Sequence, residues 1–191
     1  PVHYDRYSNP QYGYGTRGKP GTWPCTTHFE EKLHAAFQEL WDVCPLGKAE
    51  VITTAGAWVN KPGMHGKGRG FDVDGIFWAD RTFVTKNYPE DRPFYLAVEA
   101  VLRKHFGTVL NYEYNVDHQD HLHIDDGSET GFVPGHRSRV LFLQMAISHV
   151  FERPIGIDGV TGPETNGAAR KLLVDLALAD ESDVSSDSKL H

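Results

Sequence analysis

One seven-residue stretch, 119–125, constrains this chain more than any other. Its sequence, QDHLHID, alternates polar and apolar residues with the period of a half-buried β-strand. Alternate side chains of a strand share a face, so His121, His123 and Asp125 lie together and the two apolar residues between them face the core. A strand that gives a whole face to imidazole and carboxylate groups packs poorly. The pattern therefore predicts a functional site.

A second set of candidate ligands lies in residues 64–74, MHGKGRGFDVD. Residues 71–78 are rich in Phe, Val, Ile and Trp, which predicts a strand with Asp72 and Asp74 on one face. His65 precedes it, across three glycines at alternate positions. Because glycine accepts backbone angles that other residues avoid, we expect this loop to fold back and bring His65 close to Asp72.

His65, Asp72 and a histidine of the predicted strand 119–125, with water in the fourth position, would form the ligand set of an open, catalytic zinc site. Imidazole nitrogen with one carboxylate suits zinc better than magnesium or calcium, which prefer shells made only of oxygen. We therefore predict one zinc ion per chain.

At these residues the chain resembles zinc peptidases of the bacterial cell wall. His65, Gly68 and Asp72 match the His-x-x-Gly-x-x-x-Asp core of the zinc D-Ala-D-Ala carboxypeptidase and murein endopeptidase families. Residues 118–123, HQDHLH, match the His-x-x-His-x-His motif of the murein endopeptidases. The run that leads into this motif is still more similar to the bacterial extensin-like C-terminal domain. The resemblance covers residues 26–126.

The resemblance implies an α+β fold in which a small antiparallel sheet carries the zinc site and is flanked by helices. It implies that His65, Asp72 and His123 hold the zinc, that His121 is the general base and that His118 assists. The implied activity is hydrolysis of stem or cross-link peptides in peptidoglycan by zinc-activated water. The implied location is secreted or in the cell envelope.

Asp120 is the alternative base. A regular strand turns Asp120 away from His121, so Asp120 would qualify only if a bulge redirected it. Asp74 or Asp125 could hold a ligand or base imidazole from outside the ligand shell. These assignments leave His121 as the preferred base.

The substrate is less constrained than the metal. Murein enzymes carry an upstream basic residue that binds a substrate carboxylate, and here the substitutes are Lys61, Lys67 and Arg69. One alternative is therefore an enzyme on the same fold that acts on a glycan bond. Another is a zinc-containing protein that binds the cell wall or a polysaccharide without peptidase activity. The two histidines available for proton transfer favour an enzyme.

Composition excludes several classes of partner. The formal net charge of −7 argues against nucleic acid, which requires a basic patch. No apolar run approaches the roughly 20 residues of a membrane span. The chain starts at Pro1 rather than Met, so we expect a processed or trimmed form, and we expect a monomer. No phosphate-binding glycine motif or nucleophile elbow occurs.

The chain divides into three predicted parts. Residues 1–135 form the catalytic domain, residues 136–180 a helical segment, and residues 181–191 a disordered acidic tail. Within the first part, residues 1–25 are rich in Tyr, Gly and Pro, which is typical of a loop. This segment is either an arm laid over the core or a wall of the substrate cleft.

The helical segment is similar to the peptidoglycan-binding helical repeat. That repeat has the pattern Val-x-x-Leu-Gln followed by Asp-Gly-x-x-Gly-x-x-Thr, which matches residues 140–144 and 158–165. The segment is shorter than a full module, so it either binds the wall or caps the catalytic domain. We expect helices over 139–151 and 163–178, with Leu176 among the residues that face inward.

In the first domain we predict two helices and three further strands. The helices cover residues 27–42, starting with a capping box from Thr27 to Glu30, and 93–106; the strands cover 50–54, 71–78 and 108–112.

Cys25 and Cys44 flank the first predicted helix. At about 1.5 Å per residue, an intact helix separates its ends by more than roughly 20 Å. A disulfide requires Cα atoms within about 7 Å. We therefore predict that these cysteines are not joined to each other.

Overall fold

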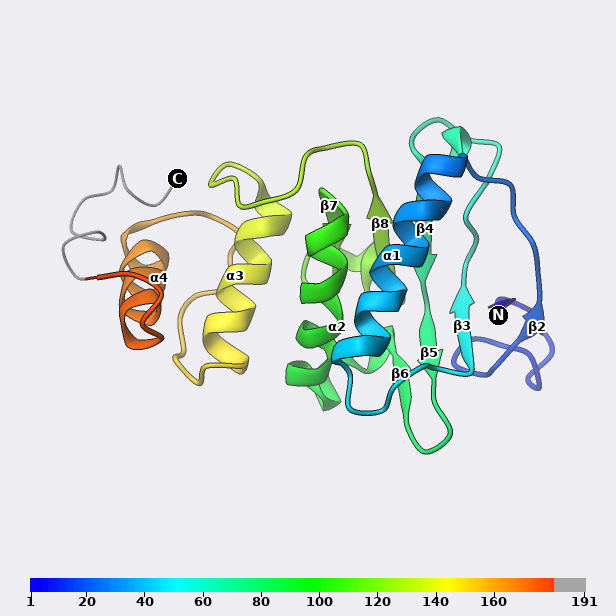
Figure 1. The fold of residues 1–191 in the computed structure, drawn as a ribbon, viewed down its shortest axis with the longest axis horizontal. Coiled ribbons are helices and arrows are strands. Elements are labelled where there is room, and N and C mark those ends of the chain that lie inside the picture. The colour runs from blue at the N-terminus through cyan, green and yellow to red at the C-terminus, as the bar shows by residue number, and fades with distance from the viewer. Residues whose placement is uncertain (181–191) are drawn as a thin grey trace. The chain divides into compact units, whose positions relative to one another are not determined.

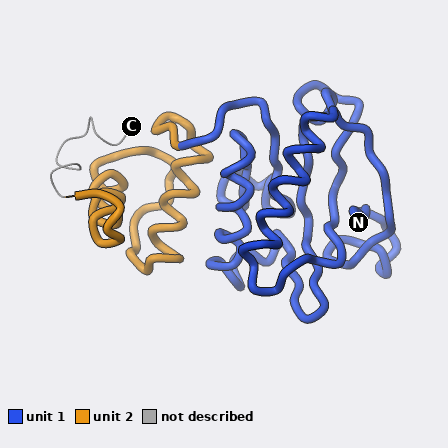
Figure 2. Tube along the Cα trace, in the orientation of Figure 1, with its two compact units in different colours: residues 1–131 blue, residues 132–191 orange. Residues whose placement is uncertain are grey.

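Residues 1–180 are described by a computed structural model, in which the chain forms two compact units, Pro1–Gly131 and Phe132–His191 (Figure 2). The division falls close to residue 135, the end of the predicted catalytic domain. The predicted acidic tail, 181–191, lies outside the described residues. None of the helices formed by residues 1–180 combines the length and apolar character that crossing a bilayer requires.

Unit 1 is a mixed α+β structure with two small sheets (Figure 1). The larger sheet has the order β2-β1-β3-β5-β6, with β1 at Val2–Tyr4, β2 at Lys19–Pro20, β3 at Val51–Thr54, β5 at Gly75–Phe77 and β6 at Thr82–Val84. The smaller sheet has the order β4-β8-β7, with β4 at Gly70–Val73, β8 at Leu122–Asp125 and β7 at Thr108–Leu110.

The small antiparallel sheet that the resemblance implies corresponds to β4-β8-β7, and the structure adds a second, larger sheet. The smaller sheet is antiparallel throughout, but in the larger one β1 pairs parallel with β3. β1 comes from the N-terminal segment, which the sequence predicts to be loop only. Its three residues are too few to show periodicity, and pairing with β3 supplies the hydrogen bonds that make them a strand.

The predicted strand 71–78 is also corrected, because it divides into β4 and β5 at Asp74. The Asp74 amide donates to Thr53 O at 2.9 Å, and Asp74 O accepts from Thr85 N at 3.0 Å. Asp74 is thus the point at which the chain passes from the smaller sheet to the larger one. Alternation stops at Asp74, but the residues that follow are again apolar and aromatic, so composition alone predicts one continuous strand.

Two helices of unit 1, α1 at Thr27–Val43 and α2 at Arg92–His105, lie next to each other over the strands (Figure 1). Phe37 of α1 packs edge-on against Phe71 of β4, with ring centroids 6.4 Å apart. Burying a side chain of this size contributes roughly 1.5–3 kcal/mol. The helices therefore anchor the sheet that carries the histidine strand.

The start of α1 differs from the predicted capping box. Thr26, not Thr27, is the N-cap, and its hydroxyl oxygen accepts the Phe29 amide at 3.4 Å. Two adjacent threonines offer the same side chain, so the sequence does not separate them. α1 then runs without a break to Val43, and Cys25 and Cys44 at its two ends are both free.

Unit 2 contains α3 at Arg137–His149 and α4 at Pro163–Asp175. One buried apolar cluster of unit 2 joins Ile147 of α3 to Ala169 and Leu172 of α4. Leu176 does not face inward as predicted. It follows the last residue of α4 and is 45% exposed, because the helix ends three residues before the predicted position.

Gln144 of α3, only 1% exposed, organises the loop between these helices. Its amide nitrogen donates to Asp158 Oδ1 and to Thr165 Oγ1, both at 2.9 Å. Its amide oxygen accepts from the backbone nitrogens of Asp158 at 3.1 Å and Gly159 at 2.8 Å. Four of the residues that match the repeat pattern, Gln144, Asp158, Gly159 and Thr165, therefore meet in one hydrogen-bond network around a buried amide.

Candidate metal centre

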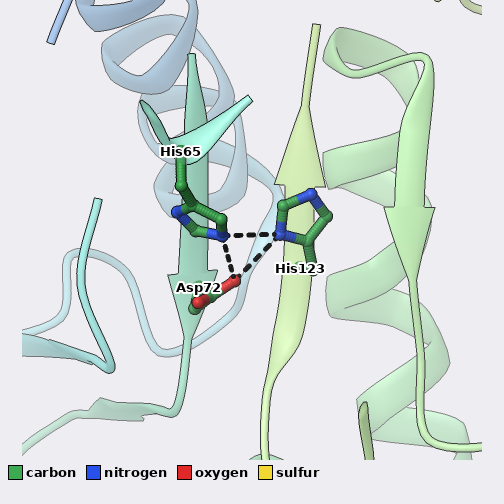
Figure 3. A group of neighbouring side chains, drawn as sticks. All are labelled: His65, Asp72 and His123. Atoms are coloured by element: carbon green, nitrogen blue, oxygen red, sulfur yellow. Dashed lines mark hydrogen bonds and ion pairs between the residues drawn. The ribbon is translucent and has the colours of Figure 1, made fainter. Parts of the chain in front are cut away.

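Three buried side chains of unit 1 meet at one point (Figure 3). Asp72 lies in the middle of β4 and is directly opposite His123 in the antiparallel pairing with β8. Asp72 Oδ1 is 2.9 Å from His123 Nδ1 and 3.1 Å from His65 Nε2. The two imidazole nitrogens are 3.0 Å apart. The three residues that we predict as ligands are thus brought together.

His65 reaches this point from the short 3₁₀-helix η1, His65–Lys67, which precedes β4. Gly68 ends η1 with a left-handed φ of 65°, a backbone conformation that favours glycine. A Cβ at Gly66 would clash with the Lys61 carbonyl oxygen. The predicted return of the glycine loop is therefore observed, and these two glycines permit it.

Hydrogen bonds outside the cluster determine which imidazole nitrogens face inward. His65 Nδ1 donates to Ala57 O at 2.7 Å, and His123 Nε2 donates to Asp125 Oδ2 at 3.0 Å. Since these acceptors carry no hydrogen, the neutral forms of both rings direct a lone pair toward Asp72 Oδ1. Three acceptor atoms about 3 Å apart repel one another unless a cation or proton lies between them.

The arrangement fits zinc. Tetrahedral coordination with bond lengths of about 2.0–2.1 Å places ligand atoms about 3.3 Å apart. The three separations here, 2.9, 3.0 and 3.1 Å, are slightly shorter, so a small expansion would complete the geometry. Two nitrogens and one carboxylate oxygen leave the fourth position open, as in catalytic zinc sites. Asp125 holds His123 in the way that outer carboxylates hold zinc-bound histidines.

Without a metal, a proton can supply the missing positive charge. Burial lowers the pKa of His123, but hydrogen bonds to Asp125 and Asp72 outweigh burial and raise this pKa to about 9. Burial raises the pKa of Asp72, but His123 and His65, when their inward nitrogens carry a proton, hydrogen-bond to this carboxylate and hold its pKa well below the usual range. The cluster is therefore an anionic carboxylate between groups that bind a cation.

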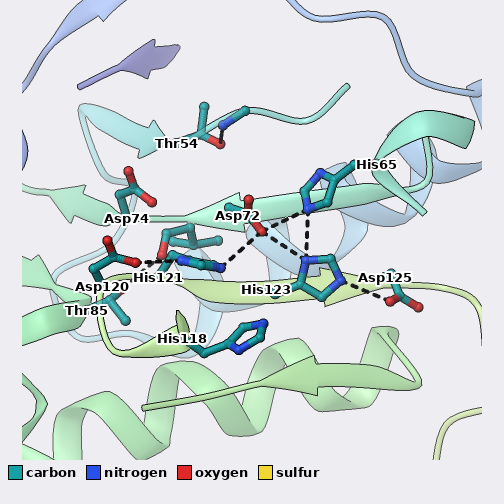
Figure 4. Close-up of polar contacts among 12 residues, drawn as sticks. Thr54, His65, Asp72, Asp74, Thr85, His118, Asp120, His121, His123 and Asp125 are labelled. Atoms are coloured by element: carbon teal, nitrogen blue, oxygen red, sulfur yellow. Dashed lines mark hydrogen bonds and ion pairs between the residues drawn. The ribbon is translucent and has the colours of Figure 1, made fainter. Parts of the chain in front are cut away.

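His121, the predicted base, immediately precedes β8 and lies beside the cluster (Figure 4). Its Nδ1 donates to Asp120 Oδ1 at 2.7 Å, which leaves the Nε2 lone pair of the neutral ring free. That Nε2 is 3.7 Å from Asp72 Oδ1. His121 is thus placed to exchange a proton with a molecule at the centre.

Asp120 is not turned away from His121 as a regular strand would require. β8 begins only at Leu122, so the alternation of a strand does not apply to residue 120. Asp120 Oδ1 accepts from His121, and its Oδ2 accepts from Arg6 at 2.7 Å. Burial raises the pKa of Asp120, but these hydrogen bonds outweigh it and lower the pKa. A carboxylate with both oxygens occupied orients the base rather than acting as one.

His118 ends the 3₁₀-helix η3, Val116–His118, and lies next to the other two histidines. Its ring centroid is 5.1 Å from that of His121 and 6.2 Å from that of His123. Its Nδ1 donates to Asn115 Oδ1 at 2.6 Å. Burial and the positive charges of the two neighbouring histidines lower the pKa of His118 to about 4. It is therefore a neutral hydrogen-bonding group near pH 7.

Asp125 and Asp74, the two carboxylates that could hold an imidazole from outside the cluster, have different partners. Asp125 accepts a hydrogen bond from the candidate ligand His123, which is one of the two arrangements that the sequence allows. Asp74 instead accepts from Arg6 Nε at 2.5 Å. Burial raises the pKa of Asp74, Arg6 opposes the rise, and the neighbouring Asp5 reinforces it. Arg6 is the residue that the sequence analysis missed, because no motif surrounds it and its partners are 68 and 114 positions away.

The three candidates for binding a substrate carboxylate differ in their contacts and exposure. Arg69 donates to the Asp126 carboxylate at 2.8 Å and to Asp126 O at 3.0 Å, so two of its three guanidinium nitrogens are bound to Asp126. Lys61 and Lys67 are exposed and lie on either side of His65 in the chain. Trp58, in the same loop as Lys61, is 43% exposed.

A cavity of about 810 Å³ lies elsewhere in unit 1, between α1 and the chain around Trp23. Trp23, Phe37 and Trp41 contribute to its lining. Neither the three metal-site residues nor His121 lines it, so we assign no chemistry to this cavity.

Comparison with known proteins gives one match. No curated protein and no solved structure matches the chain. The family model described as "Extensin-like protein C-terminus" matches residues 38–133. The matched range is half of the chain and includes the metal-site residues, His118 and His121. The chain therefore belongs to the extensin-like C-terminal family.

Proposed function

We propose that this protein is a zinc-dependent hydrolase of bacterial cell-wall peptidoglycan, a metallopeptidase of the murein endopeptidase or carboxypeptidase type. The observation that carries the proposal is the meeting of three atoms able to bind a metal, His65 Nε2, His123 Nδ1 and Asp72 Oδ1, 2.9 to 3.1 Å from one another, with His121 Nε2 beside them. A purely structural polar cluster would pair its donors with acceptors instead.

Zinc, when bound, lowers the pKa of water to near 7 and polarises a carbonyl. His121 Nε2 accepts a proton from the attacking water and returns it to the nitrogen of the leaving amine. Asp120 holds His121 Nδ1–H throughout, which fixes the tautomer and stabilises the imidazolium while it exists. His118 is a neutral hydrogen-bond partner at the side of the centre.

Substrate binding is assigned to the exposed residues on both sides of His65 in the chain. Lys61 and Lys67 are exposed cations on either side of His65 in the chain, and either would attract a stem-peptide carboxylate. The exposed indole of Trp58 offers an apolar surface in the same loop as Lys61. Arg69 is set aside because two of its guanidinium nitrogens are bound to Asp126.

Unit 2 is proposed to bind the same polymer. The support is the similarity of residues 140–165 to the peptidoglycan-binding helical repeat, with its pattern residues in one network around Gln144. Peptidoglycan as partner implies a protein that acts outside the cytoplasmic membrane, secreted or in the cell envelope, and we expect it to act as a monomer.

Digestion of purified peptidoglycan tests the proposal. The zinc-loaded protein should release peptide fragments at neutral pH, identified by mass spectrometry. His121→Ala should lower turnover by a factor of about a hundred to ten thousand, the usual effect of losing a general base, and keep its zinc. His28→Ala, which removes an exposed histidine of α1, is the matched control and should leave both unchanged.

The other outcomes decide between the alternatives. Sugar fragments without peptide cleavage would show an enzyme that acts on a glycan bond. Binding to the wall with no fragments of either kind would show a zinc-containing binding protein. An active His121→Ala protein would overturn the assignment of the base.

A further inference from the structure

Arg6 connects the N-terminal segment to the candidate catalytic residues. It follows β1, and its guanidinium bridges two carboxylates, with Nε 2.5 Å from Asp74 Oδ2 and Nη1 2.7 Å from Asp120 Oδ2. Asp74 is fully buried at the junction of the two sheets, so it anchors one end of this bridge. The other end is the residue that hydrogen-bonds His121.

Tyr14, from the same segment, holds the main chain of Asp120. Its hydroxyl donates to Asp120 O at 2.7 Å and accepts from Lys86 N at 3.1 Å. The Arg6 guanidinium lies over the Tyr14 ring, 4.5 Å from its centroid, which favours both positions. Asp120 is therefore held through its carboxylate and through its backbone by two residues of the same segment.

Asp120 has no strand pairing of its own, because β8 begins two residues later. Its position depends on these contacts from residues 6 and 14. Asp120 Oδ1 in turn holds His121 Nδ1 at 2.7 Å and leaves the Nε2 lone pair toward the centre (Figure 4). A change at Arg6 or Tyr14 would therefore displace Asp120, and the displaced Asp120 would change the orientation of the His121 imidazole. Neither step involves His65, Asp72 or His123.

We propose that Arg6 and Tyr14 are positioning residues for the general base His121, so that the N-terminal segment completes the catalytic site. The proposal rests on the proposed function. Both residues lie outside the range 38–133 that the family model matches, so this part of the site belongs to the chain's own N-terminal segment.

The two residues suggest conservative variants. A guanidinium can donate to two carboxylates from different nitrogens at once, which an ammonium group on a flexible stem does poorly. Arg6→Lys therefore keeps the charge beside buried Asp74 and weakens the bridge to Asp120. Tyr14→Phe keeps the ring under Arg6 and removes only its hydroxyl, which holds Asp120 O and also accepts from Lys86 N. The second variant avoids any change of charge, so it remains informative if the first fails to fold.

The test uses the full zinc-loaded chain and two readouts. The first is the ¹⁵N spectrum of the His121 imidazole, which reports whether Nδ1 carries the proton. The second is kcat and KM on peptidoglycan fragments, with zinc measured on each variant. Arg17→Lys and Tyr12→Phe are matched controls from the same segment, because Arg17 pairs with Glu50 and Tyr12 stacks with Lys19, away from Asp120.

We expect Arg6→Lys to lower kcat by about 10- to 100-fold, as loss of orientation does, with zinc retained and KM within about twofold. Tyr14→Phe should lower kcat in the same way but less, and both should reduce the population of the Nδ1–H tautomer. Unchanged spectra and kcat in both variants would overturn the proposal. Parallel loss of zinc and kcat would also overturn it, because the segment would then support the fold rather than the base. If the unaltered protein has no activity, the proposed function fails, and the imidazole spectra alone decide whether the segment positions His121.

Discussion

The metal-site cluster of unit 1 and the Gln144 network of unit 2 are both buried and polar, but they balance their hydrogen bonds differently. Gln144 supplies donors and acceptors in one side chain, and each meets its complement within hydrogen-bond distance. The cluster of His65, Asp72 and His123 directs three acceptors to one point. The first network is complete by itself, whereas the second requires a cation.

This difference separates a structural polar group from a candidate site. A complete neutral network lowers the free energy of one conformation and needs nothing from solution. A cluster of like acceptors raises the free energy of folding until a ligand or proton binds. The prediction is that the stability of unit 1 depends on zinc and pH, while the Gln144 network depends on neither.

The largest effect is expected from His123→Ala. It removes one of three ligand atoms, so the zinc affinity should fall by more than the roughly 10- to 100-fold that loss of an outer-shell partner costs. Elemental analysis after dialysis measures the zinc content, with His28→Ala as control. Stoichiometric zinc in His123→Ala would contradict the ligand assignment and remove the contrast with Gln144.

The next effect is the pH dependence of the metal-free protein. The pKa of His123 is raised to about 9 in the folded state, against about 6.5 in an unfolded chain. The corresponding stabilisation is fully present below pH 6.5 and is lost as the pH rises through about 9. A shift of this size is worth roughly 3 kcal/mol. Urea unfolding of unit 1 at pH 6.5 and pH 9 measures it.

Zinc should abolish that dependence, because the His123 lone pair is then used by the metal rather than by a proton. The zinc-loaded protein, unfolded at the same two pH values, is the control. A metal-free protein with equal or greater stability at pH 9 would show that the cluster does not hold a proton in this way.

Gln144→Ala should destabilise unit 2 by about 2 kcal/mol, since it leaves the buried Gly159 amide and the Asp158 amide without an acceptor. Amide hydrogen exchange in α3 and α4 measures this loss of stability. The increase in exchange rate caused by Gln144→Ala should be equal in the zinc-loaded and the metal-free protein. Gln38→Ala, on the exposed face of α1, is the matched control. A loss that zinc reverses would break the distinction between the two networks.

The smallest effect is expected from Asp125→Asn. The amide can still accept from His123 Nε2 but lacks the negative charge, so we expect a loss of about tenfold in zinc affinity, at the lower end for outer-shell partners. Competition with a chromogenic chelator measures it. Asp126→Asn alters the adjacent aspartate, which pairs with Arg69 instead of a ligand, and should not change the affinity.

Much of the candidate metal centre could be predicted from local patterns. The period of two around His121 and His123 indicates one shared face, and the glycines after His65 indicate a return of the chain; the structure brings His65, Asp72 and His123 together accordingly. The helices α1 and α2 follow from apolar residues at three- and four-residue spacing, and their observed ends differ by about one residue. These features depend on interactions between residues close in sequence, which periodicity records.

Only the tertiary structure decided the roles of Asp74, Asp120 and Arg6. Asp72 and Asp74 look equivalent in an alternating pattern, but the chain changes sheets at Asp74 and turns it toward Arg6. Asp120 lies outside the regular strand, where alternation says nothing about side-chain direction. Arg6 meets Asp120 across 114 positions without a motif at either end. Contacts of this kind depend on how whole elements pack, and no short segment of sequence encodes them.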